Sequence, residues 1–414
     1  MTNPQRARWA LLVLAASTAL VSPALAADPI KIGCSMSLTG GVAVNGKQVM
    51  MGFELWRDDI NAKGGLLGRQ VQLDCYDDQS NPTNVPSIYT KLIEVDKVDL
   101  TAGPYATNMA VPAIPVLMAH KMTTIAVTAL AANSQFHYPG YFVMLPAGPN
   151  PKQAFSEGFF DVAMSMNPKP KTVAIAAADA EFAKNSADGA RDVAKSKGLD
   201  IIYDKSFPPN TTDYSPIVRA IQALNPDIVY EAGYNPDTIG FVHAASEIGL
   251  KTKMFGGNMV GLASTTGRMQ LGPLTNGIVY ADSFSPSFTF PGLQAVLAKY
   301  QAEAAQAGTD PLGYGYIPFA YGALQILGDA VAATGGFDQQ KIAQYIHTHS
   351  FSTVAGDITF GPDGEWTKPR IITEQFRGVT GNTADQFKDP KKVVVLYPPD
   401  IKAGEFEYPY SAPK

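Results

Sequence analysis

The sequence has little of what catalytic and metal sites usually need. Its 414 residues include only 2 cysteines and 5 histidines. It contains neither a GxSxG nor an HExxH pattern, and neither cysteine has a histidine near it in sequence. We therefore expect a protein that is not an enzyme and that uses no cofactor.

Concentrated positive charge and long apolar runs are also missing. The 32 Lys and Arg residues and 37 Asp and Glu residues give a formal net charge of -5, spread along the chain without a basic block. Proteins that bind nucleic acids usually carry such a block, so we expect no nucleic-acid partner. After the N-terminal segment, no run approaches the ~20 apolar residues of a transmembrane helix.

The N-terminal segment is typical of a secretory signal peptide. Arg6 and Arg8 precede an apolar stretch over residues 9–21, and the small-residue pattern Ala-Leu-Ala follows at residues 24–26. We expect cleavage after Ala26, and no cysteine follows that would carry a lipid anchor. The mature protein is therefore expected in the periplasm.

In that oxidising compartment, two cysteines can form a disulfide. Cys34 and Cys75 both lie in predicted strands. If the strands are neighbours, the two thiols are close, but bridging adjacent strands strains disulfide geometry. A disulfide and a pair of buried thiols both remain open.

From Ile30 onward, apolar runs typical of strands alternate with amphipathic helical patterns. The first series ends near a Pro- and Gly-rich stretch at residues 145–153, after which a second series begins. Near-continuous apolar strands between amphipathic helices indicate parallel sheets covered on both faces. We therefore expect an α/β protein with two Rossmann-like lobes. We assign residues 27–146 and 284–364 to lobe I, and residues 147–283 and 365–414 to lobe II.

The loops after the strands are the expected binding region, because open parallel sheets bind ligands beyond the carboxyl ends of their strands. The expected loops of both lobes are residues 38–46, 102–108, 127–133, 178–185, 231–236 and 256–261. The first of these loops contains Asn45, which we include among the candidate ligand-binding residues. In the second, a helix that begins near Thr107 would leave backbone N–H groups free to attract a carboxylate. Alternatively, Thr107 or Asn108 only caps its own helix.

Four aromatic residues stand in or beside these expected loops or a crossover element: Tyr105, Phe182, Tyr234 and Tyr316. Each alone could be part of the core or the surface. Around one cleft, they would form an apolar box with phenol hydroxyls as polar groups.

Taken together, the chain resembles the periplasmic solute-binding proteins of branched-chain amino acid type ABC importers. The run DINAKGGLLGR at residues 59–69, followed by YDDQSNP at residues 76–82, is typical of this family. The segments at residues 30–48, 102–117, 231–251 and 320–327 also resemble it. The resemblance implies a type I periplasmic binding protein fold, with three crossovers between lobes that close on a ligand. It also implies a monomer that delivers a small carboxylate ligand to an ABC transporter permease.

The resemblance assigns roles to individual positions. Thr107 falls where the family binds the ligand carboxylate with a hydroxyl and neighbouring amides, next to Tyr105 and Ala106. A second carboxylate loop, which usually reads Pro-x-Ala-Ser/Thr, here reads Val-Thr-Ala-Leu at residues 127–130. Its usual hydroxyl is missing, so Thr128 would substitute beside Ala129.

The remaining assignments concern the second lobe and the side-chain pocket. Tyr234, Phe182 and Tyr316 match aromatic positions of the family. Members that bind α-amino acids place Glu or Asp where this chain has Asn258, and that acid pairs with the ligand ammonium. Glu181 or Glu231 could replace it.

The loss of this acid leads to the ligand hypothesis. Leaving a buried charge without its partner costs on the order of 3–5 kcal/mol. We therefore expect a carboxylate ligand without an α-amino group, such as a benzoate or phenylpropenoate derivative. The alternatives are a receptor for branched-chain or other amino acids, for an amide or for urea, and, in another class, a ligand sensor for a membrane kinase.

Overall fold

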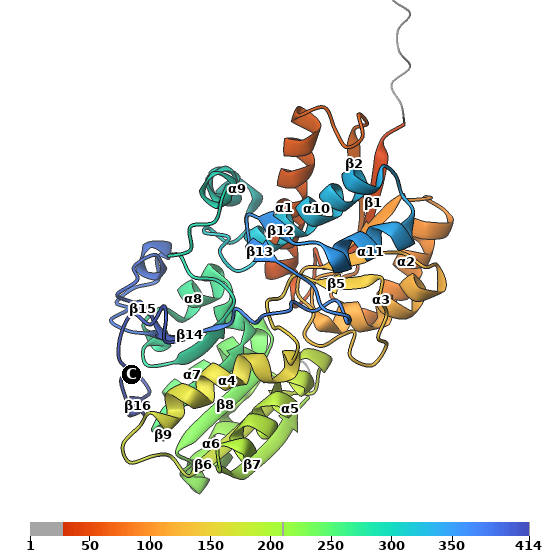
Figure 1. Ribbon diagram of the computed structural model, residues 1–414. Coiled ribbons are helices and arrows are strands. Elements are labelled where there is room, and N and C mark those ends of the chain that lie inside the picture. The colour runs from red at the N-terminus through yellow and green to blue at the C-terminus, as the bar shows by residue number, and fades with distance from the viewer. Residues whose placement is uncertain (1–27, 209–210, 414) are drawn as a thin grey trace, which may run out of the picture.

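The computed structural model describes residues 28–208 and 211–413. Figure 1 shows two lobes joined by several passages of the chain, each built on its own sheet. The predicted signal peptide lies outside the described residues. Within residues 28–208 and 211–413, no helix has the length and apolar character to cross a membrane.

Lobe I contains a five-stranded parallel sheet in the order β2-β1-β3-β4-β5. Its strands are β1 (Ile30–Met36), β2 (Val71–Asp77), β3 (Leu100–Ala102), β4 (Thr124–Ala126) and β5 (Tyr141–Val143). Helices α2 (Val85–Glu94) and α3 (Thr107–Ala119) pack together, as do α1 (Ala43–Ala62), α10 (Ile317–Thr334) and α11 (Gln339–Thr348) on the other side. The small hairpin β12 (Phe351–Thr353) and β13 (Gly356–Ile358) and the helices α9 (Leu293–Ala307) and η1 (Pro82–Asn84) complete this part.

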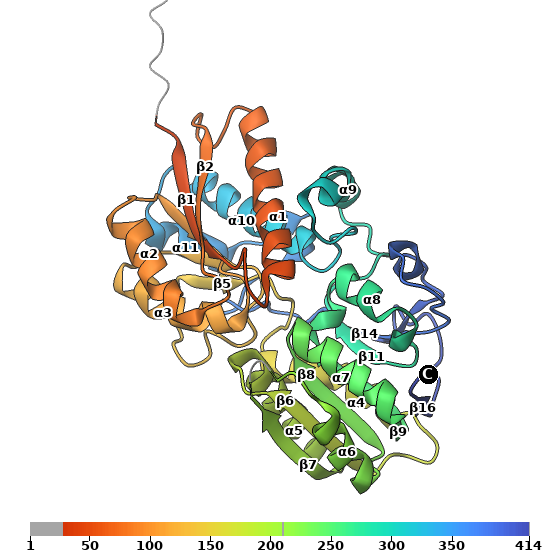
Figure 2. The same ribbon diagram turned by 180° about the vertical axis from the view of Figure 1, so that it is seen from behind.

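Lobe II contains a seven-stranded sheet in the order β15-β14-β11-β10-β8-β6-β7. Its strands are β6 (Thr172–Ala178), β7 (Asp200–Phe207), β8 (Ile228–Gly233), β10 (Met254–Met259), β11 (Val279–Asp282), β14 (Ile372–Phe376) and β15 (Val393–Tyr397). Helices α4 (Pro151–Met164) and α5 (Glu181–Ser196) cover one face, and α6 (Ser215–Leu224) and α7 (Asn235–Ile248) cover the other (Figures 1 and 2). The remaining elements are β9 (Lys251–Thr252), η2 (Val260–Leu262), α8 (Thr265–Leu271), η3 (Gly272–Thr275), η4 (Ala384–Phe387) and β16 (Tyr410–Ser411).

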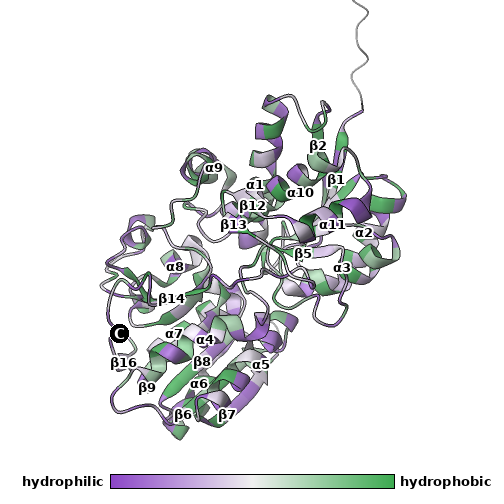
Figure 3. Cartoon of the chain, in the orientation of Figure 1, coloured by the Kyte–Doolittle hydropathy of each residue, from purple (hydrophilic) through white to green (hydrophobic). Residues whose placement is uncertain are grey.

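The burial of the strands follows their composition. Every residue of β8 is buried, and Figure 3 shows much hydrophobic colour in the strands around it, whereas the helices carry both colours. The edge strand β7 is mostly exposed on one side. Because buried strands need apolar side chains on both faces, the predicted covered sheets are confirmed.

The second sheet departs from the expectation at one edge only. Its strands β7, β6, β8, β10 and β11 are parallel, as expected, but β14 pairs antiparallel with β11, and β15 antiparallel with β14. Both strands come after the chain has returned from lobe I. They are joined by residues 377–392, which contain only one short 3-10 helix, so no long helical crossover turns the chain back into the parallel direction.

The two cysteines are joined in a disulfide. Cys34 of β1 lies directly opposite Cys75 of β2 in the parallel register, with 4.5 Å between the Cα atoms. Of the two alternatives left open by the sequence, the structure contains the bond.

Candidate functional site

A cavity lies between the two lobes, where the strand ends of both sheets meet. About 510 Å³ of space free of protein atoms lies within it, including space open to solvent. The lining residues are Tyr105, Ala106, Thr107, Thr128, Ala129, Leu130, Leu145, Phe155, Phe182, Tyr234, Asn258, Val260, Ala263, Tyr280, Ser283, Gly315 and Tyr316.

All the candidate ligand-binding residues except Asn45 are in this lining. Asn45 belongs to α1, which begins at Ala43, so it is not in a loop. Its side chain is fully buried, and its Nδ2 donates to the hydroxyl of Tyr105 at 2.8 Å. In the structure, Asn45 therefore supports a lining residue and does not itself line the cavity.

The lobe I wall is the beginning of α3. Met109 N is bonded to the carbonyl of Ala106, so the amides of Thr107 and Asn108 precede the first hydrogen bond of the helix. Ala106 has a φ of 76°, a left-handed conformation that is uncommon for alanine and that is often found at functional sites. This helix end provides positive partial charge at the cavity.

Thr107 does not cap this helix. The N-cap position is Ala106, which makes no side-chain cap bond. The Thr107 hydroxyl instead accepts a hydrogen bond from Leu130 N at 2.9 Å, which leaves its own proton free to be donated. Thr128 adds a second hydroxyl oxygen, which is buried and has no partner among the described residues.

Asn108, the other residue considered as a cap, reaches the opposite lobe. Its Oδ1 accepts hydrogen bonds from the hydroxyl of Tyr234 at 3.1 Å and from Phe182 N at 3.2 Å. Since Tyr234 and Phe182 belong to lobe II, these bonds connect the two sides of the cavity directly.

Further bonds connect the lobes nearby. Asn45 Nδ2 donates to Asn235 Oδ1 at 2.9 Å, and Asn185 Nδ2 donates to the carbonyl of Leu130 at 3.0 Å. Asn235 and Asn185 are on α7 and α5 of lobe II. The structure is therefore a closed form of the two lobes.

The aromatic residues contribute one pair from each side. Tyr105 and Tyr316 make an edge-to-face contact with 5.4 Å between the ring centroids, and their hydroxyls are 3.3 Å apart. Phe182 and Tyr234 lie at the same centroid distance with tilted rings. Burial raises the pKa of Tyr105 to about 12, so its hydroxyl is uncharged at neutral pH and can donate.

The lobe II wall is a row of strand ends. Asn258 is in β10, between β8 and β11, and is only 2% exposed. Its Nδ2 has no hydrogen-bond partner among the described residues. Tyr280 of β11 and Ser283, which follows that strand, bring two more hydroxyls to the same lining.

A buried ion cluster lies behind Ser283. Arg268 Nη2 donates to Asp282 Oδ2 at 2.6 Å and to Glu374 Oε1 at 3.0 Å. The other oxygen of Asp282, Oδ1, accepts from Ser283 N at 2.6 Å. Burial raises the pKa of Glu374 to about 8, although Arg268 lowers it in part. Because Asp282 is held by Arg268 and accepts from Ser283 N, the cluster fixes the backbone at the end of β11.

Neither acid proposed as a replacement for Asn258 lines the cavity. Glu231 is completely buried in β8, and neither of its carboxyl oxygens has a partner among the described residues. Burial raises its pKa well above the usual value, so folding favours its protonated, uncharged form. Glu181 is the first residue of α5 and is outside the lining. All the lining residues are uncharged.

The sequence missed several lining residues. Tyr280 lies in β11 and Ser283 directly follows it, so the rule used for the other strand ends could have found this strand end too. Phe155 is inside α4, and Leu145 is in the first crossover. For these two, only the closed arrangement of the lobes reveals a place in the cavity.

Comparisons with known proteins agree with this architecture. The model of a family described as periplasmic binding protein matches residues 29–378. An amino acid binding protein of Pseudomonas aeruginosa and the Leu/Ile/Val-binding protein of Escherichia coli K12 are each 26% identical, over 86% of this chain and 93% of the relative.

A solved structure extends the comparison to three dimensions. The solute binding protein of an ABC transporter from Rhodopseudomonas palustris HaA2, in complex with p-hydroxybenzoic acid, aligns with a TM-score of 0.72 at 20% identity. The alignment covers 93% of this chain and 98% of that chain. The predicted fold class, with two α/β lobes, is confirmed.

Proposed function

The chain belongs to the periplasmic binding protein family, and from this premise we propose that it captures a small aromatic carboxylate without an α-amino group and delivers it to an ABC permease. The family is of the ABC transporter type and implies a periplasmic location. We further propose that it acts as a monomer and that its lobes divide at the residues predicted from the sequence.

The observation that carries the proposal is the absence of a charged side chain from the cavity lining, all of which is described. An α-amino acid bound there would have an ammonium group without a carboxylate partner. An unpaired buried charge costs on the order of 3–5 kcal/mol. At about 1.4 kcal/mol per decade, that is two or more decades in affinity.

The cavity offers more hydrogen-bond donors to a negatively charged ligand group than acids to a positively charged one. A ligand carboxylate at the start of α3 would meet two amides that precede the helical hydrogen bonds, the hydroxyl proton of Thr107 and the unpaired hydroxyl of Thr128. Helix N-termini bind anions through such amides and the helix dipole. The carboxylate therefore needs no cationic side chain.

An aromatic ring suits the remainder of the cavity. The pairs Tyr105–Tyr316 and Phe182–Tyr234 supply ring faces and edges, and Phe155 adds a further ring. Aromatic rings gain from such contacts beyond the area that they bury. The similar protein from Rhodopseudomonas palustris was solved with p-hydroxybenzoic acid, which supports this class of ligand.

Because the similar proteins are named for amino acids, amino acids are the main competing class of ligand. The test uses mature protein from residue 27, unfolded and refolded to remove any ligand that co-purifies. Isothermal titration calorimetry then compares benzoate and 4-hydroxybenzoate with leucine, valine and urea. We expect an aromatic acid to bind at least a hundredfold more tightly than either amino acid.

Thermal unfolding gives an independent readout, because a ligand at 100 times its dissociation constant adds about 2.7 kcal/mol to the stability. Binding of leucine or valine, with no response to the aromatic acids, would overturn the proposal. A response to urea alone would favour the neutral-ligand alternative. Mass spectrometry of the molecule released on unfolding identifies the natural ligand.

A further inference from the structure

Two polar atoms of the cavity lining are buried and have no partner among the described residues: Thr128 Oγ1 and Asn258 Nδ2. They come from different lobes, one after β4 and the other from β10. Buried polar groups in folded proteins are nearly always hydrogen-bonded, so each unpaired one calls for an explanation. Inside a binding cavity, the explanation is a group on the ligand.

The two atoms require two different parts of the ligand. Thr128 forms a backbone bridge with Tyr105, just before the start of α3, where the proposed carboxylate binds. Asn258 is on the lobe II wall, with Tyr280 and Ser283. A carboxylate can satisfy the hydroxyl of Thr128, but the amide proton of Asn258 needs an acceptor elsewhere on the ligand.

The position of Asn258 is fixed by close strand packing. The preceding residue, Gly257, has a φ of 136°, and a Cβ added there would lie 2.2 Å from the carbonyl oxygen of Glu231 in β8. Only glycine allows this approach. Gly257 is also paired with Tyr280 in β11, so β10 is held between two neighbours directly before Asn258.

A charged acceptor is excluded by the surroundings. Every lining residue is uncharged, and Glu231 behind the wall is buried without partners. A second carboxylate on the ligand would therefore be desolvated without a cation. A hydroxyl group is neutral, accepts from Asn258 Nδ2 and can donate its own proton to Tyr280 or Ser283.

We propose that the ligand is a hydroxylated aromatic acid and that Asn258 selects for its hydroxyl group, which accepts a hydrogen bond from Nδ2. This rests on the proposed function, since the carboxylate end is placed by that proposal. Asn258 is then a specificity-determining residue, and the ligand spans the cavity from α3 to β10 with an oxygen at each end.

The test is a cycle of two proteins and three ligands. Calorimetry compares the protein and its Asn258→Leu variant, in which an apolar side chain of similar size replaces the amide. The ligands are benzoate, 3-hydroxybenzoate and 4-hydroxybenzoate, which keep the carboxylate and differ in the hydroxyl. We expect at least one hydroxybenzoate to bind the unchanged protein ten or more times as tightly as benzoate.

In Asn258→Leu, this preference should fall to less than threefold while benzoate binds equally well or better. Asn258→Ser, which keeps a small donor, should retain part of the preference and serves if the leucine variant does not fold. Asn167→Leu, at an exposed asparagine of the same lobe, should leave all affinities unchanged.

The outcomes separate the two proposals. If the aromatic acids bind but the hydroxyl preference is absent, or persists in Asn258→Leu, the role of Asn258 is overturned and the proposed function stands. If none of the three acids binds the unchanged protein, while leucine does, both proposals are overturned.

Discussion

In lobe I, the helix end at the cavity carries side chains that already bond to their surroundings, with one unpaired hydroxyl, that of Thr128, beside it, whereas the lobe II wall is a row of strand ends with an unpaired amide. Thr107 accepts from Leu130 N, and Asn108 accepts from two groups of the other lobe. Asn258 Nδ2 has no such bond within the described residues. The first wall suits a group that many ligands share, and the second suits a group that distinguishes them.

The lobe II wall also differs in what lies behind it. Asp237 is close to the cavity, but its Oδ1 accepts from the hydroxyl of Tyr214 at 2.7 Å and its Oδ2 from Tyr234 N at 2.9 Å. This acid therefore holds the backbone of a lining residue and does not face the ligand. Lobe II contains buried acids but presents none of them to the cavity.

The sharpest way to alter this contrast is Asn258→Asp, which adds a carboxylate to the lobe II wall. Without a cation, the new charge should weaken binding of an aromatic acid by on the order of 3 kcal/mol, which is more than a hundredfold. It should also strengthen the binding of leucine, whose ammonium it can pair with. Calorimetry with 4-hydroxybenzoate and leucine measures both changes.

The matched control for this change is Asn167→Asp at an exposed position of lobe II. It adds the same charge outside the cavity and should change neither affinity. Unchanged affinities in Asn258→Asp itself would contradict a place for residue 258 next to the ligand.

The lobe I wall is altered by Thr107→Val, which keeps the size of the side chain but removes its hydroxyl. Leu130 N loses its acceptor, and the ligand carboxylate loses a donor. We expect binding to weaken by about 1–3 kcal/mol without loss of the fold. Calorimetry and circular dichroism check the two parts of this expectation.

Thr348→Val is the control, because Thr348 is exposed at the end of α11 and bonds only within that region. The weakening in Thr107→Val should be similar for every carboxylate tested, since it concerns the shared end of the ligand. If only the hydroxylated acids lost affinity, Thr107 would contact the hydroxyl group of the ligand and not its carboxylate, which would contradict the proposal.

The smallest change concerns the buried acid behind the lobe II wall. Because burial raises the pKa of Glu231 in the folded state, folding favours its protonated form. Its contribution to the free energy of unfolding is therefore fully present below the unfolded pKa of about 4.3. That contribution is lost as the pH rises through the folded pKa. Glu231→Gln removes this dependence.

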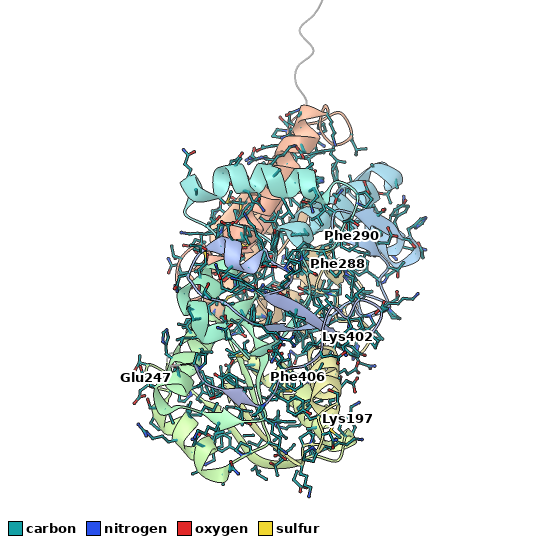
Figure 4. The ribbon with its side chains drawn as sticks, turned by 90° about the vertical axis from the view of Figure 1, so that its left-hand side faces the viewer. Lys197, Glu247, Phe288, Phe290, Lys402 and Phe406 are labelled. Atoms are coloured by element: carbon teal, nitrogen blue, oxygen red, sulfur yellow. A yellow bond between two sulfur atoms is a disulfide. The ribbon has the colours of Figure 1, made fainter. Side chains whose placement is uncertain are left out.

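We therefore expect Glu231→Gln to match the unchanged protein in thermal stability at pH 4 and to exceed it increasingly up to pH 8. Differential scanning calorimetry across that range measures the difference. Glu247→Gln is the control, since Glu247 is an exposed residue of the same lobe, as Figure 4 shows at the edge of the molecule. Equal melting temperatures at all pH values would mean that Glu231 titrates normally.

The sequence predicted the parts of this molecule that depend on local patterns. Strand and helix alternation identified the two lobes, and the rule for strand ends placed Tyr105, Tyr234 and Asn258 near one cavity. The antiparallel β14 and β15 could not be predicted in the same way, because their direction depends on where the chain returns from lobe I.

The errors at the site have a similar origin. Asn45 was assigned to a loop, but the helix begins two residues earlier, and its side chain turns toward Tyr105 and Asn235. Phe155 lines the cavity from the interior of α4, where the sequence pattern does not distinguish it from a core residue. Both depend on the contact between lobes, which no local pattern records.

The hydrogen bonds between the lobes also determine how a ligand can leave. Tyr105, Thr107 and Asn258 are each at most 2% exposed, and we expect a ligand in contact with them to leave only after Asn108 has released Tyr234 and Phe182. Every ligand then waits for the same opening step. Ligands that contact the walls differently should therefore share an upper limit to their dissociation rate, set by the protein and independent of their affinity.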